Sequence, residues 1–209
     1  KIEEMRTFWR AENTEEKVDR LFHQRYSTPM LKRIVIYDQF YRASCRIAGM
    51  NVDLDMLVHE GLPGLRRRNA AYREKNGDST FYQALDLSID VLADACRSYA
   101  ENAQQLLEGE LTEQRRQDLT EIRDMLAHLA DGKPRNFKEA LQLIWIYAIC
   151  SDLMNFGRLD NTLADFYVHD IDSGVMDEEE AIRWLSSFYR AIIRVSKVHD
   201  SRIIIGGKG

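Results

Sequence analysis

Two side chains of opposite charge, Arg158 and Asp160, are the first candidates for a binding role. If a helix begins at about Leu159, Arg158 lies at its positive end, where a cation costs about 0.3 to 1 kcal/mol unless an acidic group compensates. On the structural interpretation, Asp160 in the first turn, or a carboxylate elsewhere in the fold, supplies that group. On the functional interpretation, the pair lines a pocket and orients a substrate or another pocket-wall side chain.

Other polar clusters suggest metal chemistry only weakly. His169, Asp170 and Asp172 are close together, but they end a helix, where the dipole favours a histidine and the acids are expected to face water. His59-Glu60 lacks the second histidine one turn later that a zinc-protease pair requires. We therefore predict no metal site.

The cysteines are Cys45, Cys96 and Cys150, which are widely separated and odd in number. Each falls in a segment with a helical pattern. This arrangement favours reduced, buried thiols over a disulfide framework or a zinc site.

Composition limits the partners of the chain. Of its 209 residues, 44% are hydrophobic and 30% charged, which is typical of a globular domain with a sizeable core. A net charge of -5 does not favour nucleic-acid binding. The longest apolar run, 143–150, is far shorter than the roughly 20 residues that span a bilayer, and no signal-peptide core opens the chain. We expect a cytoplasmic protein that binds neither nucleic acid nor membrane.

Glycine and proline separate segments of helical periodicity, so the fold class is expected to be mainly α. Apolar residues repeat at three- and four-residue steps over 79–108 and again over 112–130, which predicts an amphipathic helix in each range. The sequence has no internal repeat, low-complexity tract or flexible linker. We therefore expect residues 1–209 to form a single domain.

Two further helices have predicted starts. Asn136 with Glu139, and Asp177 with Glu180, have the spacing in which a cap side chain accepts an amide hydrogen bond and the acid reaches back. The first of these helices, 137 to about 154, is apolar on all sides through its second half. Such a helix needs protein around it.

The last segment, 202–206, is a β-branched run closed by glycine, which predicts a short strand followed by a turn. A strand needs a neighbour. The other candidate strand, 34–37, fits better within a helix from 29 to about 48. We therefore expect the chain to be the helical front end of a larger protein in which a sheet follows.

The motifs between Asn136 and Ala181 resemble, in order and spacing, the N-terminal part of the glycyl radical enzymes, the family that includes pyruvate formate-lyase. The resemblance rests on residues 136–145, 156–160, 166–167, 170, 174 and 179–181. Weaker similarity at 53–55, 60–64 and 81–85 extends it to about three quarters of the chain.

The resemblance implies a large homodimeric enzyme in which helices enclose a ten-stranded α/β barrel and which works anaerobically. In that family a separate radical-SAM activase generates a radical on a glycine near the C-terminus. The radical passes to a cysteine as a thiyl, which abstracts hydrogen from a small organic substrate in a lyase or dehydratase reaction. The protein positions the substrate and excludes water and oxygen.

Neither radical residue maps onto this chain. No glycine lies in an Arg-Val-x-Gly-Tyr loop, and no cysteine lies in a predicted loop. We therefore expect this segment alone to be inactive, to contain no catalytic residue and to bind no cofactor. By the resemblance, Arg158 and Asp160 are substrate-binding or pocket-wall candidates at the barrel mouth.

Some positions depart from the family pattern and leave the substrate and the bond cleaved open. Asn161 stands where glutamine is frequent, Ala164-Asp165 where Tyr-Pro is frequent, and the link between Trp145 and Gly157 is shorter than in many relatives.

Two alternative interpretations remain. One is a stand-alone helical interaction protein derived from such an enzyme, which predicts that the apolar helix 137–154 is covered within this chain. The other is a phosphate- or metal-binding module, but the glycine-rich stretch 206–209 lacks the phosphate-loop pattern.

Overall fold

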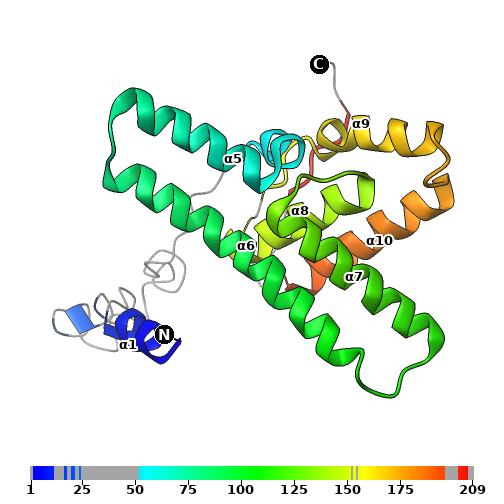
Figure 1. Cartoon of the computed structure of the whole chain (residues 1–209), viewed down its shortest axis with the longest axis horizontal. Coiled ribbons are helices and arrows are strands. Elements are labelled where there is room, and N and C mark those ends of the chain that lie inside the picture. Colours follow the sequence, from blue (N-terminus) through cyan, green and yellow to red (C-terminus); the bar gives the residue numbers. More distant parts are fainter. Residues whose placement is uncertain are drawn as a thin grey trace. The chain divides into compact units, whose positions relative to one another are not determined.

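The computed structural model describes residues 2–11, 17, 20, 21, 24, 52–151, 153, 155–195 and 202–206 (Figure 1). Residues 1–50 and 51–209 form two compact units, and each is described by itself. The expectation of a single domain stays a prediction. Cys45, the predicted helix 29–48 and the candidate strand 34–37 lie outside the described residues.

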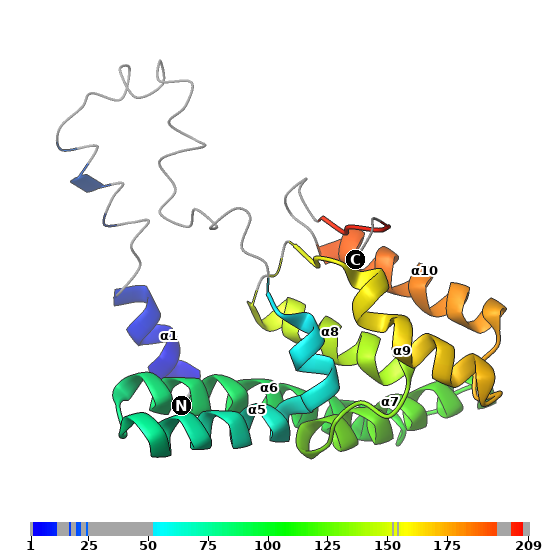
Figure 2. The ribbon, with the colours of Figure 1, turned by 90° about the horizontal axis from the view of Figure 1, so that it is seen from above.

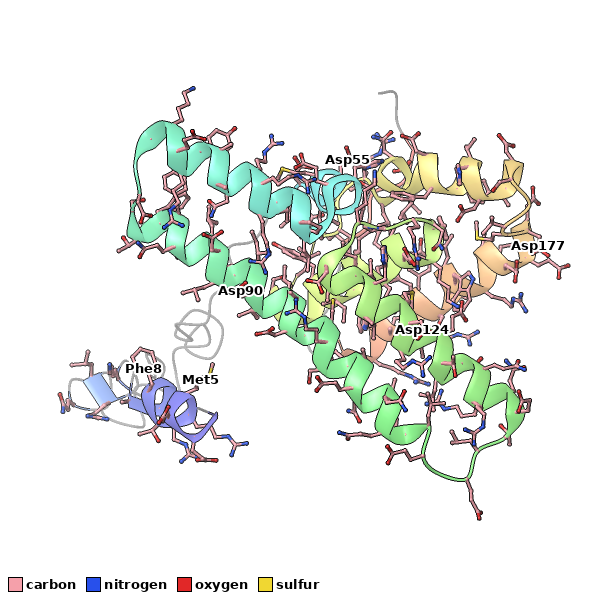
Figure 3. The ribbon with its side chains drawn as sticks, viewed as in Figure 1. Met5, Phe8, Asp55, Asp90, Asp124 and Asp177 are labelled. Carbon is pink, nitrogen blue, oxygen red and sulfur yellow. The ribbon has the colours of Figure 1, made fainter. Side chains whose placement is uncertain are left out.

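The first unit contains helix α1, Ile2–Ala11. Glu3 and Glu4 lie in its first turn and Arg10 in its last, the charge order that the helix dipole favours. Met5 and Phe8, one turn apart on this helix, are both exposed (Figure 3).

The second unit is helical in its described part, and the predicted helices are confirmed with small shifts at their ends. The helices are α5 Leu54–Asn76, α6 Thr80–Leu106, α7 Glu113–Asp131, α8 Phe137–Ser151, α9 Leu159–Asp172 and α10 Glu178–Val195. Figure 1 shows the long helix α6 forming one hairpin with α5 and a second hairpin with α7. A short turn joins α9 to α10, and the two helices diverge from it (Figure 1).

Helix α5 bends where the sequence places glycine and proline. Gly61 has a φ of 63° and a ψ of 179°, which a residue with a side chain rarely adopts, and it divides the helix into two segments. Pro63 falls in the first turn of the second segment, where its missing N–H costs no helical hydrogen bond. A Cβ atom on Gly61 would lie 2.6 Å from the Cα of Lys133, so this position is also closely packed.

Helix α8 is the centre of the second unit and contacts α5, α6, α7, α9 and α10. Leu143 and Ile144 are fully buried and Ile146 is 2% exposed, so the prediction that protein surrounds this helix is confirmed for its core residues. Trp145 is half-buried and packs edge-on against Phe188 of α10. In the described part of the chain, no helix is both long and apolar enough to cross a membrane.

The predicted cap at Asp177 is confirmed in both directions. The Glu180 N–H donates to Asp177 Oδ1 at 2.7 Å, and the Asp177 N–H donates to Glu180 Oε2 at 3.3 Å. Figure 3 shows Asp177 at the turn that joins α9 to α10. This cap fixes the start of α10 independently of tertiary packing.

The cap at Asn136 is confirmed in one direction only. The Glu139 N–H donates to Asn136 Oδ1 at 2.9 Å, as predicted. The Glu139 carboxylate does not reach back to Asn136 but accepts the backbone N–H of Arg135 at 2.7 Å and pairs with the Arg135 guanidinium. This ion pair compensates the burial of Glu139, which is 3% exposed.

The predicted strand at 202–206 is wrong as a regular element. In the described part of the chain this segment makes one isolated parallel bridge, between Arg202 and Asn155. The Phe156 N–H donates to the Arg202 carbonyl at 2.8 Å and the Ile204 N–H to the Gly157 carbonyl at 2.9 Å. A pairing this short does not make a strand, and its partner, Asn155, lies just before α9.

Candidate functional site

A half-open cavity of about 350 Å³ lies beside the start of α9. Helix α9 supplies one wall through Leu159, Asp160, Leu163, Ala164, Tyr167 and Val168. The rest of the wall comes from Phe137 of α8, Leu185 and Tyr189 of α10, and Ile203 and Ile205 of the terminal segment. Figure 2 shows this segment beside the start of α9 and the end of α10. Asp160 is the charged side chain of this wall.

Arg158 and Asp160 form an ion pair across the start of α9. Arg158 Nε donates to Asp160 Oδ1 at 2.9 Å, and Arg158 Nη2 donates to Oδ2 at 3.2 Å. This two-pronged geometry is typical of strong arginine–carboxylate pairs. Asp160 is therefore the acidic partner that Arg158 needs at this helix end, and the role of the pair in a pocket stays a prediction.

Asp160 also holds the terminal segment. The Gly206 N–H donates to Asp160 Oδ2 at 2.9 Å, a contact between residues 46 positions apart. The Arg158 guanidinium, and then this N–H group, lower the pKa of Asp160 from 3.8 to about 2. Asp160 in turn raises the pKa of Arg158.

Of the two candidate residues, Asp160 lies in the cavity wall and Arg158 does not. Arg158 occupies the cap position of α9 without a side-chain cap hydrogen bond. Its guanidinium instead fixes the Asp160 carboxylate. The structure thus brings the two predicted residues together, with different positions relative to the cavity.

Asp170 does not face water, so that expectation is wrong. It is 2% exposed and accepts the backbone N–H of Phe137, the first residue of α8, at 2.7 Å. His169 Nδ1 lies 3.0 Å from the other carboxylate oxygen. Among the described residues, no cluster of three or more histidine, cysteine or acidic side chains is placed to hold a metal ion.

The cysteine expectation is confirmed at one position and wrong at another. Cys96 is a fully buried free thiol, and burial raises its pKa from 9.0 to about 11. Cys150 is a free thiol but exposed, because it lies near the end of α8 on a side that other described helices leave uncovered.

Sequence reasoning did not identify the α10 and terminal parts of the cavity wall. Leu185 and Tyr189 are one turn apart, and the spacing of Ile203 and Ile205 places both on one face of an extended segment. These periodicities were present in the sequence. Which other elements those faces meet depends on tertiary packing.

The sequence of the whole chain has relatives among known proteins. It matches the family described as "Pyruvate formate lyase-like" over residues 1–203. The chain belongs to this family. The resemblance to glycyl radical enzymes seen in the sequence is thereby confirmed.

Curated relatives include the "Probable dehydratase YbiW" of Escherichia coli K12, 25% identical over 169 residues, or 73% of this chain and 21% of the relative. The "4-hydroxyphenylacetate decarboxylase glycyl radical subunit" of Clostridioides difficile strain 630 is 31% identical over 133 residues, or 61% of this chain and 15% of the relative. The chain thus spans about a fifth or less of the length of these relatives.

Two solved structures share the fold of this chain. A structure titled for 1,2-propanediol dehydration in Roseburia inulinivorans has a TM-score of 0.70 and 20% sequence identity to this chain. The match covers 76% of this chain and 23% of the chain in that structure. The structure of hydroxyproline dehydratase from Clostridioides difficile has a TM-score of 0.65 and 24% sequence identity to this chain. The match covers 88% of this chain and 25% of the chain in that structure. At these identities the matches establish the fold of the helical segment.

Proposed function

We propose that the protein containing this chain is a glycyl radical lyase or dehydratase that acts on a small organic substrate by thiyl-radical hydrogen abstraction. The observation that carries the proposal is the family match over residues 1–203. Relatives named as dehydratases and as a decarboxylase glycyl radical subunit support the reaction class. Substrate identity is left open, because specificity depends on individual side chains and not on the fold.

In this proposal the described helices are the outer wall of a ten-stranded α/β barrel. The intact enzyme is a cytoplasmic homodimer that works anaerobically, and a radical-SAM activase installs its glycyl radical. The 209-residue chain by itself is inactive. Neither described cysteine fits a thiyl site well, because Cys96 is fully buried and Cys150 lies on a helix.

Arg158 and Asp160 are proposed to shape the pocket wall. Asp160 contributes to the described cavity, and its ion pair with Arg158 fixes the direction of the carboxylate. The hydrogen bond from Gly206 links this pair to the terminal segment. A change at Arg158 would therefore alter the wall through Asp160, even without direct contact between Arg158 and a substrate.

Turnover tests the reaction class. The intact protein is incubated without oxygen with a radical-SAM activase, S-adenosylmethionine and a panel of small diols, hydroxy acids and amino acids, and mass spectrometry follows the loss of water or a carbon fragment. Activase-dependent conversion of at least one compound is expected. Conversion that does not depend on the activase would contradict radical catalysis.

The role of the pair is tested in the same enzyme. Arg158→Ala is expected to raise KM or lower kcat, whereas Arg97→Ala removes exposed ion pairs to Asp94 and Asp131 and leaves both constants unchanged. A loss of stability with unchanged KM and kcat in Arg158→Ala would dismiss the pocket role.

One observation favours the alternative of a stand-alone helical interaction protein. The core residues of α8 are buried within this chain, as that alternative predicts. Against it, Ile204 and Ile205 are 45% and 72% exposed, so the terminal segment leaves apolar surface uncovered. A monomeric 209-residue chain that unfolds cooperatively and captures a specific protein partner would favour this alternative.

A further inference from the structure

The cavity beside α9 has a wall that is almost entirely apolar, although part of it opens to solvent. We propose that this cavity is a binding site for an uncharged, mainly apolar small molecule. The cavity is the one whose wall Arg158 and Asp160 are proposed to shape, so this inference rests on that pocket role. Binding is measured without an activase, so a failure to bind is distinguishable from a failure of the radical reaction.

The first argument is charge. Asp160 is the charged group of the described wall, and its carboxylate accepts hydrogen bonds from Arg158 and from the Gly206 N–H. Its charge is therefore balanced within the protein. A charged ligand would lose water without gaining an opposite charge, whereas an uncharged ligand matches the wall.

The second argument is shape. A volume of about 350 Å³ lies in the range of small-molecule pockets in proteins. Phe137 and Tyr167 contact each other edge-on with ring centroids 6.1 Å apart, which leaves an aromatic surface beside branched aliphatic side chains. Such walls suit an aromatic or branched aliphatic group.

The third argument is that the cavity is fixed in position by the surrounding fold. The Phe137 backbone is held by buried Asp170, and the terminal segment is held by Asp160 and by Gly157. These contacts are hydrogen bonds to Asp170, Asp160 and Gly157, and they fix three parts of the wall in place. A ligand therefore enters a preformed site and meets little cost of ordering the protein.

The fourth argument is exposed apolar surface at the cavity. Val168 and Ile205 contribute to the wall yet are 54% and 72% exposed. A molecule seated against these side chains would remove their apolar surface from water, which favours binding.

The test uses N-phenyl-1-naphthylamine, an uncharged probe whose fluorescence rises in apolar surroundings. Ala164 is an exposed wall residue, so Ala164→Trp fills the cavity from a position where the larger side chain is tolerated. Ala84→Trp is the matched control, because Ala84 is an exposed helical alanine outside the wall. Circular dichroism verifies that both variants keep the native helix content.

Saturable binding with a Kd on the order of 10 to 100 µM is expected for the wild-type chain. Ala164→Trp is expected to weaken it at least about tenfold, and Ala84→Trp to leave it unchanged. Absence of saturable binding, or equal binding by both variants, would overturn the proposal. Sedimentation that shows a dimeric wild type and a monomeric Ala164→Trp variant would also overturn the proposal, because a second copy of the chain would then occupy the cavity.

Discussion

Asp170 of α9 accepts the backbone N–H of Phe137, the first residue of α8, with an N···O distance of 2.7 Å. The carboxylate is 2% exposed, and it lies at the positive end of the central helix. One buried charge therefore joins the most buried helix of the second unit to the helix that forms the cavity wall.

Asp170→Ala is predicted to lower the free energy of unfolding by about 2 to 4 kcal/mol, because it leaves a backbone N–H unpaired and removes a favourable charge at the start of α8. Urea unfolding followed by circular dichroism measures the change. Asp172→Ala, two positions along and exposed, serves as the control and should change stability by less than about 0.5 kcal/mol. Equal effects of the two variants would show that the Phe137 contact contributes little.

Gly61→Ala is predicted to destabilise the chain more than Gly77→Ala. Both glycines have positive φ with extended ψ, so an alanine side chain is strained at either position by about 1 to 3 kcal/mol. At Gly61 the added Cβ would also lie 2.6 Å from Lys133 Cα, whereas nothing lies within 4 Å at Gly77. Thermal unfolding of the two variants separates the effect of the clash from that of the backbone strain. A Tm of Gly61→Ala equal to or above the Tm of Gly77→Ala would refute the predicted clash at Gly61.

Asp160 is predicted to stay ionised at pH 3, because Arg158 and the Gly206 N–H lower its pKa from 3.8 to about 2. A carboxylate with a lowered folded-state pKa stabilises the fold above the unfolded value and loses this effect as pH falls. The extra stability of the wild type over Asp160→Asn should therefore shrink as the pH falls from 3.8 to about 2. Carboxyl ¹³C NMR measures the ionisation, and Arg158→Gln should raise the pKa of Asp160 toward 3.8 and so increase its protonated fraction at pH 3.

The two described thiols are predicted to differ in reactivity. In a Cys45→Ser background, Cys150 should react with a disulfide reagent in the native chain, since it is exposed. Cys96 should react only after unfolding, because it is buried and its pKa is raised to about 11. Labelling of Cys150→Ser and Cys96→Ser variants distinguishes the sites. Fast native labelling of Cys96 would disprove the burial of that thiol.

The sequence predicted features set by near neighbours. The cap of α10 is formed by Asp177 and Glu180, which are three positions apart. The ion pair is formed by Arg158 and Asp160, which are two positions apart. Their geometry follows from the local backbone. Helix periodicity likewise located α6 and α7 to within one or two residues.

Features that depend on distant residues were not predictable in the same way. The burial of Asp170 follows from a contact with Phe137, 33 positions away. The exposure of Cys150 depends on which sides of α8 the other helices cover. The pairing of Arg202 with Asn155 depends on the path of the chain after α10. Periodicity gives the apolar face of an element but not its neighbour.

The central claim, that this chain is part of a glycyl radical enzyme, is tested most directly by electron paramagnetic resonance. The intact protein that contains this chain is incubated without oxygen with a radical-SAM activase and S-adenosylmethionine, and a sample without activase is the control. We predict a doublet from a carbon-centred radical in the activated intact protein and none in the control or in the 209-residue chain alone. An intact protein that remains silent after this incubation would contradict the claim.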